Sequence, residues 1–324
     1  MPAVTADNPL LLPRVPSPAA GTVERPVERV VAAHRQTEGA GFEIARPFPG
    51  ALSMRDADPF LLLDHVGPRL NGPGETRGAP WHPHRGFETV TYLLDGEISH
   101  HDTFGGGGVI RAGETQWMTA GAGIQHDELP TERAYREGGL FHGVQLWVNL
   151  PRSLKRTSPR YQAIERDDVV LLASDDGGAL LRVIAGDVAG HVGRGSTHTP
   201  ITYLHATLAP GARLAVPWPR EFSAMAYVLT GQGSAGPQER PVGADDLVVF
   251  GPGDNVVVRA ADRMADDSDA LDVLLLGGLP IREPIAHYGP FVMNTREEIA
   301  EAIEDYQAGR LGVIPPDQLN RSFS

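Results

Sequence analysis

Short apolar runs separated by glycine, proline and aspartate are the feature that most restricts how this chain can fold. They start at Val27 and recur in both halves, for example as FETVTYLL at residues 87–94 and LDVLLLGG at residues 271–278. Runs of this length between turn residues are typical of β-strands. The 38 glycines and 28 prolines among 324 residues supply many turns, which favours sandwiches or barrels of short strands.

The length of the chain predicts two domains of about 150 residues each. We expect residues 1–26, which are rich in proline and alanine, to form a flexible tail. Residues 27–150 and 151–294 share the strand-like pattern and are predicted to form one β-barrel each. Residues 295–324 are expected to form a short helix and a C-terminal tail. The predicted fold class is therefore all-β, with two barrels packed together.

Two local signals predict particular turns and ends. Asp95-Gly96 stands between two strand-like runs, which favours a hairpin with a two-residue turn. Near the C-terminus, Thr295 is the expected N-cap of the helix and Gly309 its stop.

The net charge of the chain restricts the kinds of molecule that it is expected to bind. The formal net charge is -13 at pH 7, the isoelectric point is about 5.3, and the single lysine, Lys155, lies in no basic run. An acidic surface repels phosphate backbones, so direct nucleic-acid binding is not expected. The N-terminus has no basic region of a signal peptide, and no apolar stretch approaches ~18 residues. We therefore expect a cytoplasmic protein without a membrane span.

The absence of cysteine restricts the chemistry to other side chains. It excludes disulfides, thiolate metal sites and thiol catalysis. Any metal must be held by histidine, aspartate or glutamate. Two pairs with the same spacing are available, His82 with His84 in HPH and His126 with Glu128 in HDE.

Alternation along a strand places residues two apart on the same face. Each of the two pairs can therefore aim both side chains at a common interior point. Three imidazoles and one carboxylate suit a divalent metal such as iron, manganese, nickel, copper or zinc, and leave two octahedral positions open. On a continuous strand, Glu88 shares the face of His82 and His84. Spacing alone therefore leaves Glu88 and Glu128 as alternative carboxylate ligands.

Longer stretches of the sequence resemble one family. HPHRGFETVTYLLDGEISHHD, QWMTAGAGIQHDE, HGVQLWVNLP and GGLPIREPIAHYGPFVMNT closely resemble the pirin family of bicupins. The resemblance covers roughly residues 27–309. It implies two cupin (jelly-roll) barrels, with one mononuclear metal in the N-terminal barrel and none in the C-terminal barrel.

The resemblance also assigns residues to the site. It implies metal ligands at His82, His84, His126 and Glu128, with Glu88 a neighbour of the metal shell rather than a ligand. Asp64 of LLLDH and Gln145 of HGVQLW match family positions near the metal pocket, and both are expected to line it. The implied metal is most often Fe²⁺, with manganese, nickel, copper, cobalt or zinc as alternatives.

Three functions follow from the resemblance. The first is a flavonol dioxygenase of the quercetin 2,3-dioxygenase type, which uses dioxygen to open a ring of a small aromatic substrate. Glu128 is then the candidate catalytic base, since a ligand carboxylate has a second oxygen. The second is a redox-sensing regulator that binds a metabolic enzyme or a transcription factor. The third is a cupin isomerase or lyase, because one fold hosts many chemistries.

Overall fold

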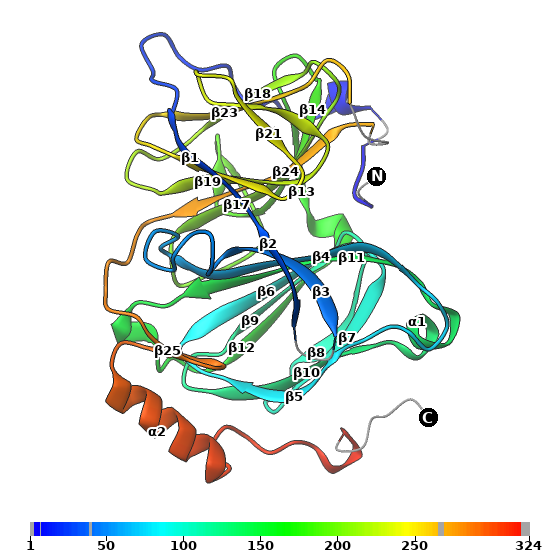
Figure 1. The fold of residues 1–324 in the computed structure, drawn as a ribbon, viewed down its shortest axis with the longest axis vertical. Helices are drawn as coiled ribbons and strands as arrows, with labels where there is room; N and C mark the ends of the chain where they lie inside the picture. Colours follow the sequence, from blue (N-terminus) through cyan, green and yellow to red (C-terminus); the bar gives the residue numbers. More distant parts are fainter. Residues whose placement is uncertain (1–2, 7, 39–40, 265–268, 319–324) are drawn as a thin grey trace.

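Two seven-stranded sheets lie face to face at the centre of the molecule, and a four-stranded sheet closes each into a barrel (Figure 1). The computed structural model describes residues 3–6, 8–38, 41–264 and 269–318. The prediction of an all-β protein with two cupin barrels and a short C-terminal helix is confirmed.

The N-terminal barrel is built from eleven strands, and the short helix α1 (Glu132–Glu137) lies beside it. Its large sheet has the order β12 (Arg160–Ile164), β9 (Thr115–Thr119), β6 (Phe87–Asp95), β11 (Gly139–Asn149), β4 (Phe60–Asn71), β3 (Phe42–Phe48), β2 (His34–Glu38). Its small sheet has the order β5 (Ala79–His84), β10 (Ile124–Pro130), β7 (Glu97–Asp102), β8 (Gly107–Arg111).

The C-terminal barrel repeats this arrangement. Its large sheet has the order β1 (Val27–Ala32), β22 (Asp246–Phe250), β19 (Ala224–Thr230), β24 (Leu271–Gly278), β17 (Ile201–Leu208), β14 (Ala179–Ala185), β13 (Val170–Ala173). Its small sheet has the order β18 (Arg213–Pro217), β23 (Asn255–Ala260), β20 (Gln232–Ala235), β21 (Arg240–Gly243). The remaining elements are the pairs β15 (Asp187–Val188) with β16 (His191–Val192) and β25 (Ala286–Tyr288) with β26 (Phe291–Met293), the helix α2 (Arg296–Gln307), and the 3₁₀ turns Pro9–Leu11, Arg152–Leu154, Arg166–Asp168 and Pro316–Gln318.

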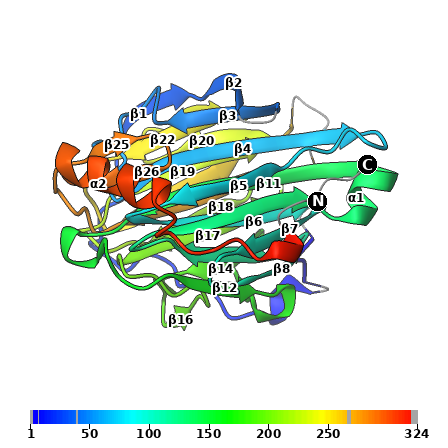
Figure 2. The same ribbon diagram turned by 90° about the horizontal axis from the view of Figure 1, so that it is seen from below.

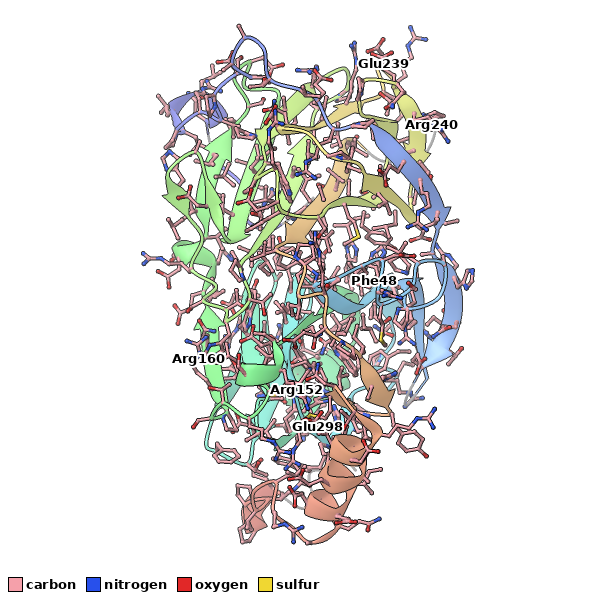
Figure 3. The ribbon with its side chains drawn as sticks, turned by 90° about the vertical axis from the view of Figure 1, so that its left-hand side faces the viewer. Phe48, Arg152, Arg160, Glu239, Arg240 and Glu298 are labelled. Carbon is pink, nitrogen blue, oxygen red and sulfur yellow. The ribbon has the colours of Figure 1, made fainter. Side chains whose placement is uncertain are left out.

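An apolar layer between the two large sheets joins the barrels. Val90 and Tyr92 of β6 pack in one cluster with Tyr227 and Leu274 of the C-terminal barrel. Phe48, which is fully buried, also lies in this layer, midway along the molecule in Figure 3. Burial of apolar surface stabilises such a layer by roughly 25 cal/mol per Å², so the two barrels form one packed unit.

The interiors of the two barrels differ. The C-terminal barrel is filled by a large apolar cluster that includes Leu204, Val228 and Leu275. In the N-terminal barrel, the inward residues of β6 include Phe87 and Thr91, and beside them lies a cavity. The N-terminal barrel therefore contains an internal cavity where a small ligand could lie.

Segments cross the domain boundaries that the sequence suggested. Strand β1 pairs with β22, so it belongs to the C-terminal sheet. Residues 8–26 are not a detached tail, because Arg14 forms a bridge with Ala173 and both Val15 and Arg25 are buried. In the opposite direction, β12 pairs with β9 of the N-terminal sheet. Each of the two predicted domains therefore contributes one strand to the large sheet of the other barrel.

The chain after β24 returns to the N-terminal barrel. Helix α2 lies at one end of that barrel and α1 at the other (Figures 1 and 2). Thr295 caps α2, and its capping box with Glu298 matches the predicted start of the helix. Among the residues that the structure describes, no helix is long and apolar enough to span a membrane.

The hairpin predicted at Asp95-Gly96 is wrong. Strand β6 pairs with β9 and β11, whereas β7 pairs with β10 and β8. The chain does turn at Gly96, where an added Cβ would lie 2.8 Å from the carbonyl oxygen of Leu140. This turn moves the chain from one sheet to the other, and a two-residue turn signal does not distinguish that from a hairpin.

A tight corner at Gly86 separates β5 from β6. Gly86 has a φ of 91°, and an added Cβ would lie 2.0 Å from the carbonyl oxygen of Val292. The buried ammonium of Lys155 donates to the Gly86 oxygen at 2.8 Å, the Val292 oxygen at 3.1 Å and Asn149 Oδ1 at 2.7 Å. One lysine therefore holds three segments together at the corner.

Lys155 should make stability depend on pH. Burial lowers the pKa of Lys155 from 10.5 to about 7. Between these values the unfolded chain binds more protons than the folded one, so the free energy of unfolding should rise with pH. We expect the wild type to gain up to about 1.4 kcal/mol per pH unit over Lys155→Met from pH 7 to 9.5. Urea unfolding of both proteins measures this, and a difference that stays flat with pH would contradict it.

Candidate metal centre

Two neighbouring strands bring three histidines together inside the N-terminal barrel. In the antiparallel register of β5 and β10, His82 lies directly opposite His126, and His84 lies opposite Ile124. The ring centroids of His82, His84 and His126 are 4.3 to 4.9 Å apart, and one ring nitrogen of each lies within 4.8 Å of the others. Residues two apart face the same side in each strand, as the spacing predicted.

Backbone carbonyls fix the orientation of two of these rings. The Nδ1 atom of His82 lies 2.8 Å from the Pro80 oxygen, and that of His84 lies 3.3 Å from the Pro290 oxygen. A carbonyl only accepts a hydrogen bond, so both Nδ1 atoms carry a proton. The Nε2 atoms of the two rings lie 3.1 Å apart. A metal cation bound between them would be coordinated by both nitrogens.

The third ring offers a free nitrogen to the same space. Among the described residues, Nε2 of His126 is buried and has no hydrogen-bond partner. Burial and the neighbouring histidines lower the pKa values of His84 and His126 well below the usual range. Both rings are therefore neutral at physiological pH. Three imidazoles whose ring nitrogens meet at one point fit a divalent transition metal.

Glu128 lies on the same strand face but is held differently. One of its carboxylate oxygens lies within 4.8 Å of ring nitrogens of His100 and His126. It is not part of the cluster that His82, His84 and His126 form. Its Oε1 accepts hydrogen bonds from Thr91 Oγ1, at 2.8 Å, and from Gln116 Nε2. Neither bond uses Oε2. The structure thus places Glu128 beside the histidines, with one oxygen anchored on β6 and β9.

Glu88 lies on the far side of the large sheet, which corrects the expected position. The corner at Gly86 breaks the alternation, so β6 turns its even-numbered residues toward the C-terminal barrel. The Glu88 carboxylate there accepts hydrogen bonds from Thr119, at 2.8 Å, and from Thr197 of the C-terminal half. Glu88 does not line the cavity. Its neighbours are groups of the domain interface, not the histidine cluster.

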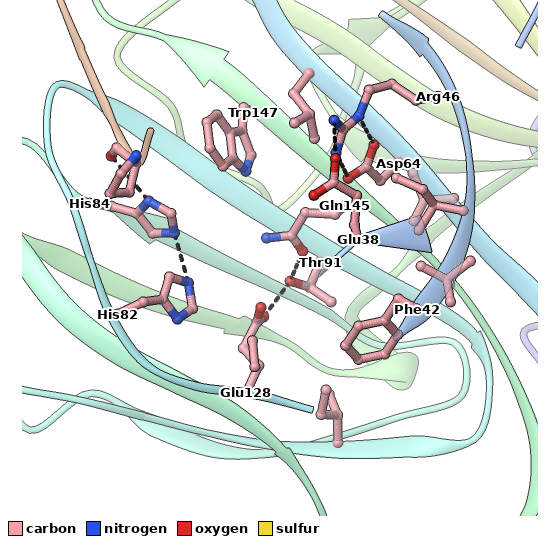
Figure 4. A pocket seen from close by; sticks show the side chains of 18 of the residues that line it. Glu38, Phe42, Arg46, Asp64, His82, His84, Thr91, Glu128, Gln145 and Trp147 are labelled. Carbon is pink, nitrogen blue, oxygen red and sulfur yellow. Dashed lines mark hydrogen bonds and ion pairs between the residues drawn. The ribbon is translucent and has the colours of Figure 1, made fainter. Parts of the chain in front are cut away.

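A cavity of about 600 Å³ opens beside the histidines (Figure 4). Its wall is mainly apolar and includes Phe42, Ile44, Leu62, Val66, Leu93, Ile98, Phe141, Val144 and Trp147. Both Asp64 and Gln145 line it, as does Glu128. Gln145 Oε1 lies 2.6 Å from Thr91 Oγ1, whose single proton serves either Gln145 or Glu128.

The wall across the cavity from the histidines carries an ion-pair network. Arg46 binds both carboxylate oxygens of Asp64 at 2.6 Å and a Glu38 oxygen at 2.8 Å. Burial raises the pKa of Asp64 despite the opposing effect of Arg46. Figure 4 shows this network and the histidines at opposite sides of one space. The cavity therefore has two polar ends and an apolar middle.

Comparison with known proteins identifies the family. The sequence profile described as pirin matches residues 41–148, and that described as pirin C-terminal cupin domain matches residues 203–312. A pirin-like protein of Arabidopsis thaliana is 42% identical over 299 residues, which cover 91% of this chain and 92% of that protein. The chain belongs to the pirin family. Pirin of Homo sapiens is 38% identical, over 87% of this chain and 92% of its own.

A solved structure shares both the sequence similarity and the fold of this chain. The crystal structure of a quercetin 2,3-dioxygenase from Acinetobacter baumannii is 36% identical to this chain. It superposes with a TM-score of 0.81, over 90% of this chain and 99% of that chain. The resemblance to pirins that the motifs suggested is thus confirmed.

Several residues around this pirin site were missed by sequence reasoning. Thr91 and Gln116, which hold Glu128, lie on strands whose inward face could be assigned only after the corner at Gly86 was located. Trp147 packs edge-on against His84, with ring centroids 5.2 Å apart, and stands two residues after Gln145 on the same strand face. That spacing was a usable signal. Arg46 gave no signal, because its partner Asp64 is 18 residues away.

Removal of individual side chains tests the metal centre. We expect His82→Ala and Glu128→Ala each to weaken Zn²⁺ or Fe²⁺ binding by at least about 100-fold, because each removes a donor atom. Titration calorimetry with the purified protein measures this. Glu88→Gln is the matched control, since its amide still reaches Thr119 and Thr197, and it should retain metal. Loss of metal in the Glu88 variant, with retention in the Glu128 variant, would reverse the assignment.

Proposed function

We propose that this protein is a mononuclear metal dioxygenase that acts on flavonols or similar hydroxylated aromatic compounds. The observation that supports this most strongly is the convergence of three histidines at one end of a cavity whose middle is apolar. The volume of about 600 Å³ lies within the range of small-molecule sites, about 300–1,000 Å³. The quercetin dioxygenase at 36% identity supports the same substrate class.

In this proposal His82, His84, His126 and Glu128 hold the metal, and the resemblance to pirins implies that it is most often Fe²⁺. Manganese, nickel, copper, cobalt and zinc remain alternatives. The bound metal would supply Lewis acidity, which lowers the pKa of a coordinated substrate hydroxyl. Dioxygen is the second substrate.

Glu128 acts as the base. The hydrogen bonds of Thr91 and Gln116 fix the carboxylate through its Oε1, and in this proposal one carboxylate oxygen would bind the metal while the other accepts the proton of the substrate hydroxyl. Thr91 also links this carboxylate to Gln145, which lies further along the wall. These side chains fix the distance between the proton acceptor and the substrate ring.

The remaining walls hold the aromatic rings and keep water out. Trp147 and Phe42 offer aromatic faces or edges, and Leu62 and Val144 fill the space between the polar ends. Apolar walls of this kind bind flat rings by area burial and make the electrostatic contacts inside stronger.

The ion-pair network selects against acidic substrates. Arg46 with Asp64 and Glu38 carries a net charge of -1 when both carboxyls are ionised. Carboxylate oxygens accept hydrogen bonds from hydroxyl groups and repel a second carboxylate. The far end of the cavity therefore suits a neutral, hydroxylated ring.

Turnover of a flavonol panel tests the activity directly. The protein loaded with Fe²⁺, Mn²⁺ or Ni²⁺ should consume dioxygen with at least one flavonol, and Glu128→Gln should lower kcat by about 100-fold or more. An oxygen electrode measures both. Absence of turnover with all three metals and every flavonol would refute the dioxygenase proposal. The redox-regulator and isomerase or lyase functions would then become the leading explanations.

Asp64→Asn tests the far end of the cavity. We expect this change to raise KM for a hydroxylated substrate by about tenfold, since a hydrogen bond to a charged acceptor is worth about 1.5–3 kcal/mol. The value of kcat should change little, because Asp64 lies away from the histidines. Unchanged KM, with a folded variant by circular dichroism, would show that this end does not contact substrate.

A further inference from the structure

A second layer of side chains stands behind His126. The His100 side chain is fully buried, and its Nδ1 lies 3.2 Å from Nδ1 of His126. On its other side, His100 Nε2 lies 3.7 Å from Asp102 Oδ2. The ring of Tyr161 stacks on the His100 ring, with centroids 5.1 Å apart and planes inclined by 27°. No role was expected of His100 or Asp102 from the sequence.

Asp102 is fixed by the backbone of the following turn. Its Oδ1 accepts hydrogen bonds from the N–H groups of Phe104, at 2.7 Å, and Gly106, at 2.9 Å. An added Cβ at Gly106 would lie 2.2 Å from Asp102 Oδ2, so glycine is needed there for the carboxylate to fit. Oδ2 is thereby left to face His100.

Of the two placements of protons on these rings, one suits the surrounding groups better. If His100 donated through Nδ1, its bare Nε2 would face the Asp102 carboxylate, and the Nε2 proton of His126 would be buried without an acceptor among the described residues. If His126 donates through Nδ1, His100 accepts there and turns its Nε2 proton toward Asp102. The second placement gives the pair of Nδ1 atoms one donor and one acceptor, and it leaves His126 Nε2 bare. The His100 Nε2 proton then points at Asp102 Oδ2 across 3.7 Å, an electrostatic contact that is longer than a hydrogen bond.

We propose that His100 is a positioning residue, oriented by Asp102, that holds His126 in the tautomer able to bind a metal through Nε2. A histidine ligand commonly donates its other N–H to a carboxylate or carbonyl. Here His100 lies between the ligand His126 and the carboxylate of Asp102. Asp102 therefore influences the tautomer of His126 indirectly, through His100. This inference rests on the proposed metal role of His126, but not on flavonol turnover.

Asp102→Asn separates this role from simple packing. Asparagine keeps a carbonyl oxygen for the N–H groups of Phe104 and Gly106, but it presents an amide donor to His100. His100 Nε2 must then accept, which moves its proton to Nδ1 and forces His126 into the tautomer protonated at Nε2. We expect zinc affinity to fall by about 10–100-fold. Nitrogen-15 NMR of the histidine rings should show His126 changing from Nδ1–H to Nε2–H in the metal-free variant.

Two further variants keep the test independent of folding. His100→Gln offers a side-chain oxygen to the His126 N–H and should retain most of the zinc affinity, whereas His100→Leu offers none and should lose it. His101→Gln is the matched control, because His101 faces away on the same strand, toward Asp127, and this change should leave zinc affinity unaltered.

The possible outcomes distinguish failure of the proposed metal site from failure of the proposed role of His100. If the wild type does not bind zinc, the proposed metal site fails, and this inference fails with it. If the wild type binds zinc but Asp102→Asn changes neither affinity nor the His126 tautomer, the inference alone is overturned. Equal losses in His100→Gln and His100→Leu would likewise overturn it, because His100 would then be a ligand or a packing residue.

Discussion

The contact between Gly86 and the backbone of Val292 is the constraint on which the geometry of the site depends. A side chain at Gly86 would collide with the Val292 oxygen, and the Lys155 ammonium binds the carbonyl oxygens of both residues. This corner ends the strand that carries His82 and His84 and begins β6 with a new alternation. It also brings the C-terminal segment against the N-terminal barrel, where the Pro290 oxygen orients His84. Residues more than 200 positions apart therefore shape one cluster.

The two barrels have the same architecture but use their interiors differently. In the C-terminal barrel, apolar side chains such as Leu204 and Leu275 fill the space and stabilise the fold. In the N-terminal barrel, polar side chains project into the interior, where each needs a partner because buried polar groups are costly alone. Thr91 and Gln116 supply that partner for Glu128, and Asp64 for Arg46. Polar side chains are therefore stable in this interior only when they are hydrogen-bonded to one another.

The sequence predicted the fold and the histidine pairs well, because both depend on local patterns. Short runs between turn residues indicate strands, and the spacing of His82 with His84 holds within a single strand. Glu88 was misplaced on the histidine face because a single corner reverses the alternation, and the pattern of apolar residues is the same on either side of it. A strand buried on both faces carries no polar alternation from which to find the phase.

Long-range contacts account for the other differences. The pairing of β1 with the C-terminal sheet and the contacts of residues 8–26 depend on segments more than 100 positions away. A glycine turn at Gly96 specifies a change of direction but not the sheet that receives the chain. The link from His126 through His100 to Asp102 joins two strands by side-chain geometry that no spacing rule contains. Such features follow from packing and could be found only in three dimensions.

Anomalous X-ray diffraction from crystals grown with zinc or iron tests the central claim most directly. One strong peak is expected in the N-terminal barrel, at about 2.1 Å from Nε2 of each of the three histidines, with an oxygen of Glu128 as a further ligand. A peak bound by Glu88, or a metal found only outside the barrel, would contradict the account.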